Sequence, residues 1–217
     1  MIEPEQSRTR VKICGVTNRA DAEAAISFGA DALGFNLFAG SKRRIDLERE
    51  AHWIGALPPF VSKVAVLVNV PLEEARRIAE HPAIDLVQFH GDEDEEYCAR
   101  FAESGRPFIR ALRLASAGDL EKADRFSTPD LLVDAHVPGA YGGTCAKIDL
   151  ELARELGTRC PELRVILAGG LTPANVGEAV RLVRPFAVDV ASGVESAPGS
   201  KDPELMRAFV RSARGTD

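Results

Sequence analysis

The sequence predicts an α/β fold, a single (β/α)8 TIM barrel, and three observations favour it. Short β-rich segments alternate with helical patterns along the whole chain, as in parallel sheets. Segments such as 64–68 and 164–168 are apolar on consecutive residues, which is typical of strands buried on both faces. The length of 217 residues suits an undivided barrel. An open doubly wound sheet is the main alternative, but the first β-to-α turn lacks its G-x-G-x-x-G fingerprint.

The first half of the chain contains four strand–helix units. The segment 63–68 is strongly β-branched, and the helical segments carry apolar residues at intervals of three and four. A basic loop at 40–44 follows the second strand. The predicted elements are strand 11–14, helix 19–28, strand 31–36, helix 47–57, strand 63–68, helix 72–81, strand 86–90 and helix 93–104.

The second half repeats the same alternation. A glycine-rich loop separates the sixth strand from its helix, and Gly157 is placed to end that helix. Thr172 and Pro173 form a plausible helix start after the seventh strand. The predicted elements are strand 107–112, helix 118–126, strand 131–134, helix 150–156, strand 164–168, helix 173–183, strand 186–190 and helix 203–213.

Composition bounds the domains, the partners and the compartment. Residues 1–10 form a short polar extension without the apolar core of a signal peptide, and residues 11–217 form the catalytic barrel domain. No apolar stretch is long enough to cross a bilayer. The net charge of -6 argues against nucleic acid as a partner. The four cysteines form no C-x-x-C pair or zinc spacing. We therefore expect a cytoplasmic protein with reduced thiols, no membrane partner and no metal.

Chemistry in a β/α barrel is expected at the carboxyl ends of the strands. Cys14 ends the first strand, where a thiol with a lowered pKa could act as a base or nucleophile. Asp134 ends the sixth strand after an apolar run and could act as a general acid or base. The alternatives are a buried unreactive thiol at Cys14 and a helix-capping or loop-bracing carboxylate at Asp134.

Two glycine turns predict a phosphate site. Gly169 and Gly170 follow the seventh strand, and Ser192 and Gly193 follow the eighth. The loops after these two strands, with an adjacent helix N-terminus, are the recurrent phosphate site of the fold. We therefore expect a small phosphorylated substrate. The alternative is a pair of ordinary tight turns.

Other polar residues near the strand ends are candidate binding residues. Arg43 lies in the basic loop, where its guanidinium could clamp a substrate carboxylate, although such loops are commonly solvated turns. His90 closes the fourth strand and is either a binding residue or a structural histidine. Asp189 lies within the eighth strand and is expected to have a partner inside the barrel. Paired glycines at 142 and 143 could let a loop fold over the site.

Together these junctions resemble those of the phosphoribosylanthranilate isomerase family of tryptophan biosynthesis. The resemblance runs from about residue 11 to beyond residue 202, with each motif in order at its strand end. The matching motifs are VKICGVTN, GADALGFNLF, SKRRI, VQFHGDE, LLVDA followed by YGGT, LAGGLTPANV, VRPFAVDVASGVE and PGSKD.

The resemblance implies a (β/α)8 barrel that converts N-(5-phosphoribosyl)anthranilate to 1-(2-carboxyphenylamino)-1-deoxyribulose 5-phosphate by an Amadori rearrangement, without a cofactor. It implies that Cys14 is the general base and Asp134 the general acid, and that Arg43 holds the anthranilate carboxylate. Asp189 corresponds to a family aspartate near the aromatic end of the substrate. The phosphate-binding turns correspond to Gly169, Gly170, Ser192 and Gly193.

The sequence departs from the family pattern at three places. It has Cys145 where the family has a glycine, Ile148 and Leu150 around Asp149 where the family has Phe and Trp, and Ala191 where the family has a serine. These departures bear on loop dynamics, turnover rate and one phosphate contact. Two other functions stay open, namely the Amadori isomerisation of the histidine pathway and a non-catalytic phosphate-binding barrel. The family includes monomers and homodimers, and either state fits the chain.

Overall fold

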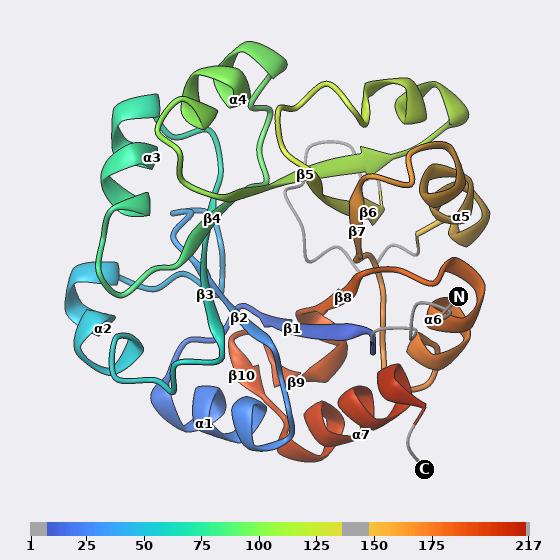
Figure 1. Cartoon of the computed structure of the whole chain (residues 1–217). Helices are drawn as coiled ribbons and strands as arrows, with labels where there is room; N and C mark the ends of the chain where they lie inside the picture. The colour runs from blue at the N-terminus through green and yellow to red at the C-terminus, as the bar shows by residue number, and fades with distance from the viewer. Residues whose placement is uncertain (1–7, 136–147, 216–217) are drawn as a thin grey trace, which may run out of the picture.

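Eight parallel strands close into a barrel in the computed structural model, which describes residues 8–135 and 148–215. Each strand pairs with its neighbours in sequence order, and β1 closes the ring by pairing with β8. Figure 1 looks into this ring, with the helices outside it. The predicted fold class is therefore confirmed. The strands are β1 Arg10–Cys14, β2 Ala32–Asn36, β3 Ser62–Leu67, β4 Leu86–Phe89, β5 Phe108–Leu114, β6 Asp130–Ala135, β7 Arg164–Leu167 and β8 Ala187–Val190.

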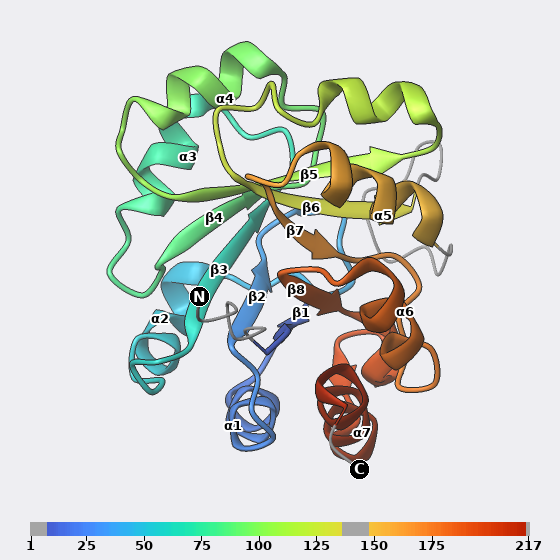
Figure 2. The same cartoon turned by 45° about the vertical axis from the view of Figure 1, so that its right-hand side comes forward.

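Helices cover the outside of the barrel, as the turned view in Figure 2 also shows. Several begin at an aspartate or asparagine whose side chain accepts a hydrogen bond from the first helical turn, including Asn18 before α1 and Asp202 before α7. This local capping explains why their starts agree closely with the sequence pattern. The helices are α1 Arg19–Ser27, α2 Leu47–Ile54, α3 Leu72–Ala79, α4 Glu95–Ala102, the 3-10 helix η1 Ala117–Lys122, α5 Leu150–Arg159, α6 Val176–Val183 and α7 Pro203–Arg214.

The barrel has two hydrophobic cores because successive residues of each strand point to opposite faces. The larger core fills the space between strands and helices and includes Val11 and Ile13 of β1. The smaller core lies among interior-facing residues. Its members are Val64, Ile109, Ala111, Leu132, Ile166, Ala168 and Ala187. A strand residue therefore faces the barrel interior when its neighbours along the strand belong to the larger core. It also does so when it lies two positions from a member of the smaller core.

The helix expected at 118–126 is instead the 3-10 helix η1, which ends at Lys122. The carboxylate of Asp119 accepts hydrogen bonds from the backbone N–H groups of Ala115 and Ser116, which fixes its start. Phe126, beyond the helix, is buried, and its ring lies 5.0 Å from the guanidinium carbon of Arg110. We attribute the early end to this packing, which anchors the chain after η1 against β5.

Two helix boundaries differ from the prediction. Gly157 does not end the helix that follows β6, because this helix, α5, continues to Arg159. The helix that follows β7, α6, begins at Val176 rather than at Pro173, since the preceding residues form a turn. In that turn the side chain of Asn175 accepts a hydrogen bond from the Thr172 N–H, an interaction that the sequence periodicity does not reveal.

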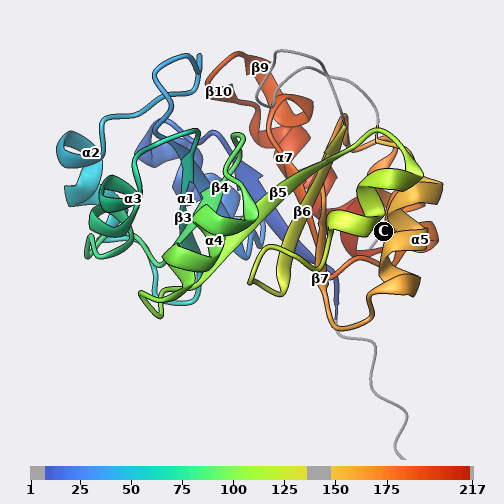
Figure 3. The same ribbon diagram turned by 90° about the horizontal axis from the view of Figure 1, so that it is seen from above.

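A short segment after β8 was not predicted. The 3-10 helix η2 (Ser192–Val194) leads into an antiparallel hairpin of β9 (Glu195–Ala197) and β10 (Ser200–Lys201). In Figure 3 the hairpin lies at one end of the barrel, near the loop that follows β2. The strands are too short to produce an alternating pattern, but Pro198 and Gly199 mark the turn between them.

The described residues contain no helix long and apolar enough to cross a membrane. The predicted barrel boundary at residue 11 falls one residue after the start of β1 at Arg10. Most of the predicted N-terminal extension lies outside the described residues.

Replacement of Gly157 by alanine should stabilise the chain. Gly157 lies inside α5, and a Cβ there would meet no atom within 4 Å. Alanine loses less backbone entropy in a helix, so we expect a gain of about 0.5–1 kcal/mol and a Tm higher by about 2 °C. Gly105→Ala is the control, because Gly105 also has open space but a φ of +70°. Its Tm should fall, and an unchanged or lower Tm in Gly157→Ala would contradict the helical placement of Gly157.

Candidate active site

The predicted site residues face the barrel interior at the carboxyl ends of their strands. Cys14 alternates with Ile13 of the outer core, and Asp134 follows Leu132 of the inner core by two residues. Asp189 follows Ala187 in the same way on β8. His90 directly follows β4 and is buried. The parallel strands therefore bring polar groups from distant parts of the sequence to one end of the barrel.

Cys14 lies in a space that the absence of a side chain at Gly34 leaves open. These two residues are register partners on β1 and β2. A Cβ at Gly34 would lie 2.7 Å from the Cys14 Sγ and 3.1 Å from the Lys12 Nζ. The sulfur and the ammonium therefore border the same small volume. Glycine is required there for steric reasons.

The charges around Cys14 act on its thiol in opposite directions. Burial raises the pKa of Cys14 above its ordinary value, and the carboxylate of Asp189 adds to this effect. The ammonium groups of Lys12 and Lys201 lower the pKa of the thiol, and Lys12 also does so through a hydrogen bond. The net result is a raised pKa, so the resting cysteine is mainly a protonated thiol at neutral pH.

Lys12 and Asp189 form a buried ion pair in the barrel interior. They are register partners on β1 and β8, and the Lys12 Nζ donates a hydrogen bond of 2.7 Å to the Asp189 Oδ1. Burial alone would lower the pKa of Lys12, but Asp189 and Cys14 more than offset this and raise it. Asp189 therefore has the interior partner that its position predicted.

Asp134 is held by its own strand end and by His90. Its Oδ1 accepts a hydrogen bond of 2.8 Å from the Ala135 N–H, and its Oδ2 lies 3.3 Å from the His90 Nε2. The other ring nitrogen of His90 lies 2.8 Å from the Gln88 Nε2. If the Gln88 amide donates to Nδ1, the His90 proton is on Nε2 and points at Asp134. Gln88, Asp134 and His90 thus form a chain of polar contacts.

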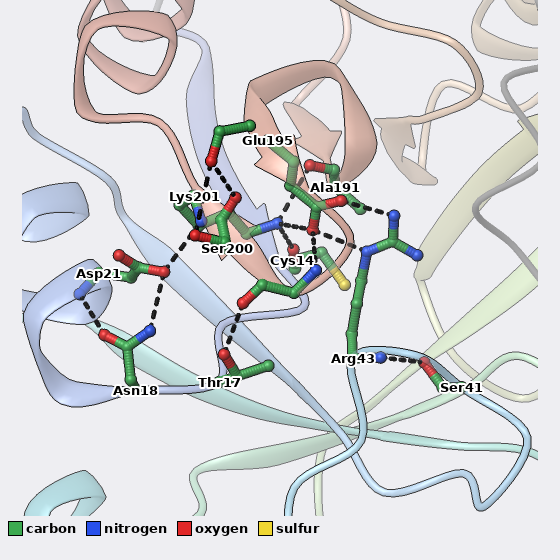
Figure 4. A network of polar contacts seen from close by, with 12 residues as sticks. Cys14, Thr17, Asn18, Asp21, Ser41, Arg43, Ala191, Glu195, Ser200 and Lys201 are labelled. Atoms are coloured by element: carbon green, nitrogen blue, oxygen red, sulfur yellow. Dashed lines mark hydrogen bonds and ion pairs between the residues drawn. The ribbon is translucent and has the colours of Figure 1, made fainter.

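A network of three charged residues lies beside Cys14, as Figure 4 shows. The guanidinium of Arg43 donates two hydrogen bonds of 2.7 Å to the carboxylate of Glu195. The buried ammonium of Lys201 donates to Glu195 at 2.8 Å and to the backbone carbonyl of Cys14 at 2.6 Å. It also donates to the carbonyl of Ala191. The network therefore connects the ends of β1 and β8 to the basic loop after β2.

The β9–β10 hairpin is fixed against α1 by further bonds. Thr17 donates its hydroxyl to the Gly199 carbonyl at 2.6 Å, and the Lys201 N–H donates to the Asp21 carboxylate. Sequence reasoning missed Glu195 and Lys201 as site residues. Both fall in the quoted motifs, but their function depends on partners that are far away in the sequence.

The turns after β7 and β8 approach each other closely. Gly169 and Gly170 have φ angles of 88° and 65°, which favour glycine. A Cβ at Gly193 would lie 1.9 Å from the Leu171 carbonyl oxygen, so only glycine fits between the two turns. Asn175 braces the first turn by donating to the Gly170 carbonyl at 3.0 Å. Paired glycine turns next to short helices can expose backbone N–H groups to an anion.

Gly169 also contacts the candidate acid. A Cβ at this position would lie 2.8 Å from the Ala135 nitrogen and 3.0 Å from the Asp134 Oδ1. The turn after β7 therefore borders the end of β6, and the predicted phosphate turn lies next to Asp134.

The glycine-rich loop, a metal site and the other cysteines were also considered in the sequence. The loop with Gly142, Gly143 and Cys145 falls outside the described residues. Among the described residues, no group of three or more His, Cys, Asp or Glu side chains could hold a metal ion. Burial raises the pKa of Cys98 to about 12, so this thiol on the buried face of α4 is unreactive. These findings direct attention to the interior ends of the strands.

Comparison with known proteins identifies the family by sequence and by structure. The family model of N-(5′-phosphoribosyl)anthranilate (PRA) isomerase matches residues 11–212. An N-(5′-phosphoribosyl)anthranilate isomerase from Neisseria meningitidis serogroup C is 47% identical over 210 residues, covering 95% of this chain and 97% of that protein. The structure of phosphoribosyl anthranilate isomerase from Thermotoga maritima is similar at a TM-score of 0.86 and 39% identity, covering 95% of this chain and 99% of that one.

A second solved structure adds a ligand. It is a phosphoribosyl anthranilate isomerase in complex with reduced 1-(o-carboxyphenylamino)-1-deoxyribulose 5-phosphate. It is similar to this chain at a TM-score of 0.82 and 37% identity, covering 95% of this chain and 99% of that one.

Replacement of Glu195 by glutamine should destabilise the chain at neutral pH. The carboxylate side chain is 4% exposed and compensates the buried Lys201 and the partly buried Arg43, so its loss should lower the free energy of unfolding by about 3 kcal/mol. Burial raises the pKa of Glu195, but hydrogen bonds from Arg43 and Lys201 outweigh this and lower it below 4.5. Its stabilising effect should therefore be present above that pH and lost as the pH falls further.

Urea unfolding at several pH values measures this effect. The difference between the parent chain and Glu195→Gln should shrink on acidification. Glu204→Gln is the matched control, because Glu204 pairs with Arg207 on the solvent-exposed face of α7. Equal losses in the two variants would show that the network contributes no more than a surface ion pair.

Proposed function

The chain belongs to the N-(5′-phosphoribosyl)anthranilate isomerase family, and from this premise we propose that it rearranges N-(5′-phosphoribosyl)anthranilate to 1-(2-carboxyphenylamino)-1-deoxyribulose 5-phosphate. The observation that carries the proposal is the presence of a thiol and a carboxyl group on interior-facing ends of β1 and β6. These are the two groups that a proton-transfer isomerisation needs. The reaction belongs to the biosynthesis of tryptophan.

The substrate is held by its two charged ends. Its phosphate lies at the glycine turns of Gly169–Gly170 and Ser192–Gly193, where backbone N–H groups can approach it. Its anthranilate carboxylate binds Arg43, whose guanidinium is oriented by the side-on contact with Glu195. Binding at both ends holds the sugar between the acid and the base. Such positioning by itself lowers the activation barrier of the reaction.

The first chemical step opens the sugar ring. Asp134, in its protonated form, donates a proton to the ring oxygen of the furanosylamine. The bond between C1′ and that oxygen breaks, and the lone pair of the anthranilate nitrogen forms a C1′=N iminium. His90 orients the carboxyl group through its contact with Oδ2. In this role His90 acts on Asp134, in addition to the substrate contact that its strand-end position predicts.

The second step moves the proton from C2′. Cys14 reacts through the minor thiolate form of its side chain, which the ammonium groups of Lys12 and Lys201 favour against the effect of burial. The thiolate accepts this proton, and the electrons of the C–H bond form a C1′=C2′ double bond while the iminium nitrogen becomes neutral. The resulting enolamine tautomerises to the ketone by protonation at C1′. The iminium of the substrate is the electron sink, so we expect no cofactor.

The binding partner that follows from this proposal is a small phosphorylated molecule. For assembly we infer a monomer or a homodimer. A solved structure from Thermotoga maritima is of mutually generated monomers of a dimeric phosphoribosylanthranilate isomerase, so both states are known for that protein.

Removal of either proton-transfer group should abolish most activity while the chain still folds. We expect Cys14→Ala and Asp134→Asn each to lower kcat/KM by about 10²-fold or more, because general acid–base catalysis contributes effects of that size. The assay follows the loss of anthranilate-type fluorescence with phosphoribosylanthranilate generated in place. Cys160→Ser is the control, since this thiol lies at the end of α5, away from the barrel mouth.

An active Cys14→Ala enzyme would refute the base assignment. No activity in the parent chain, together with turnover of the corresponding histidine-pathway substrate, would transfer the mechanism to that reaction. Binding of the substrate without any turnover would instead favour the non-catalytic barrel.

A further inference from the structure

We propose that Lys12 is a positioning residue for Cys14, and that its ammonium, held by Asp189 on the neighbouring strand, compensates the negative charge that forms on the sulfur. The proposal rests on the proposed role of Cys14 as the base. It assigns the buried Lys12–Asp189 pair a function in addition to the place near the aromatic end of the substrate that the family resemblance implies for Asp189.

The stability of the barrel does not account for this pair. Lys12 and Asp189 are 3% and 7% exposed and lie in the barrel interior next to apolar residues such as Ala187 and Leu132. Buried ion pairs are often no more stable than apolar residues of the same volume, because both charges lose their hydration. A charged pair inside an apolar barrel is a departure from good packing of the kind found at functional sites.

The position of the ammonium suits a charge on the sulfur. Lys12 and Cys14 are two residues apart on β1, so both face the interior. The Cβ that Gly34 lacks would touch both the Lys12 Nζ and the Cys14 Sγ, so the two atoms border one small space. An ammonium has three donors. One is used by the Asp189 Oδ1, and the ammonium also interacts electrostatically with the Cys14 thiol.

The remaining charged groups near Cys14 do not take this place. The ammonium of Lys201 donates a hydrogen bond to the backbone carbonyl of Cys14 and not to the Cys14 sulfur. It also pairs with Glu195, which Arg43 contacts as well. Asp189 is the facing anion on β8, and it raises the pKa of the thiol. Gly34 contributes no side chain from β2. Lys12 is therefore the cation that acts most strongly on the sulfur.

The two members of the pair should have opposite effects on the thiol. In Lys12→Met the sulfur loses its cation and still faces Asp189, so it should ionise less readily. In Asp189→Asn the ammonium stays beside the sulfur without its carboxylate, so the thiol should ionise more readily. A purely structural pair predicts instead that both variants change the thiol alike, because each breaks the same contact.

The ultraviolet absorbance of the thiolate measures this directly. The Cys14 signal is the difference between each chain and the same chain carrying Cys14→Ser, recorded at one alkaline pH at which circular dichroism shows that all variants are folded. We expect about tenfold less Cys14 thiolate in Lys12→Met, and more in Asp189→Asn, than in the parent chain. Lys63→Met, which removes the partner of Asp85 at the start of β3, is the control and should leave the signal unchanged.

A second pair of variants guards against misfolding. If Lys12→Met does not fold with Asp189 unpaired, the double variant Lys12→Met/Asp189→Asn is compared with Asp189→Asn, and it should contain less thiolate. Shifts in the same direction, or no shift, would overturn the proposal. The titration needs no substrate, so an active Cys14→Ala enzyme would refute the base assignment without affecting this result.

Discussion

The alternation of side chains along closed parallel strands is the constraint on which this molecule depends. Every second residue of each strand must enter a narrow interior, and the other residues must pack under the helices. Away from the carboxyl ends of the strands, that interior holds small and branched apolar side chains such as Val64 and Ile166. Towards the carboxyl ends the same phase brings in Lys12, Cys14, Asp134 and Asp189. The site is thus the polar end of the barrel core.

Charges in such an interior need partners, and the chain provides them across strands. Lys12 pairs with Asp189, and Glu195 compensates both Arg43 and Lys201. Such groups are expensive to bury alone, so each is held in one geometry by its partner. Rigid placement of charges is also what proton transfer requires, since the acid, the base and the substrate must keep their orientation during the reaction. Burial in the fold and proton transfer therefore both require these residues to keep one geometry.

The sequence predicted the strands and indicated the candidate site residues because both produce local signals. Buried parallel strands are apolar runs, and strand ends such as Cys14 and Asp134 stand out where those runs stop. The partners were not predictable in this way. Lys12 and Asp189 are 177 residues apart, and Arg43 and Glu195 are 152 apart, so their pairing depends on closure of the ring. The early end of η1 and the late start of α6 depend on tertiary packing and on side-chain hydrogen bonds that periodicity does not record.

A crystal structure of this chain with reduced 1-(o-carboxyphenylamino)-1-deoxyribulose 5-phosphate tests the central claim most directly. The account predicts the phosphate at the turns of Gly169–Gly170 and Ser192–Gly193 and the carboxylate at Arg43. It also predicts that C2′ of the analogue contacts the Cys14 sulfur, with Asp134 on the other side of the sugar. A sugar that lies away from Cys14, with another side chain against C2′, would contradict it.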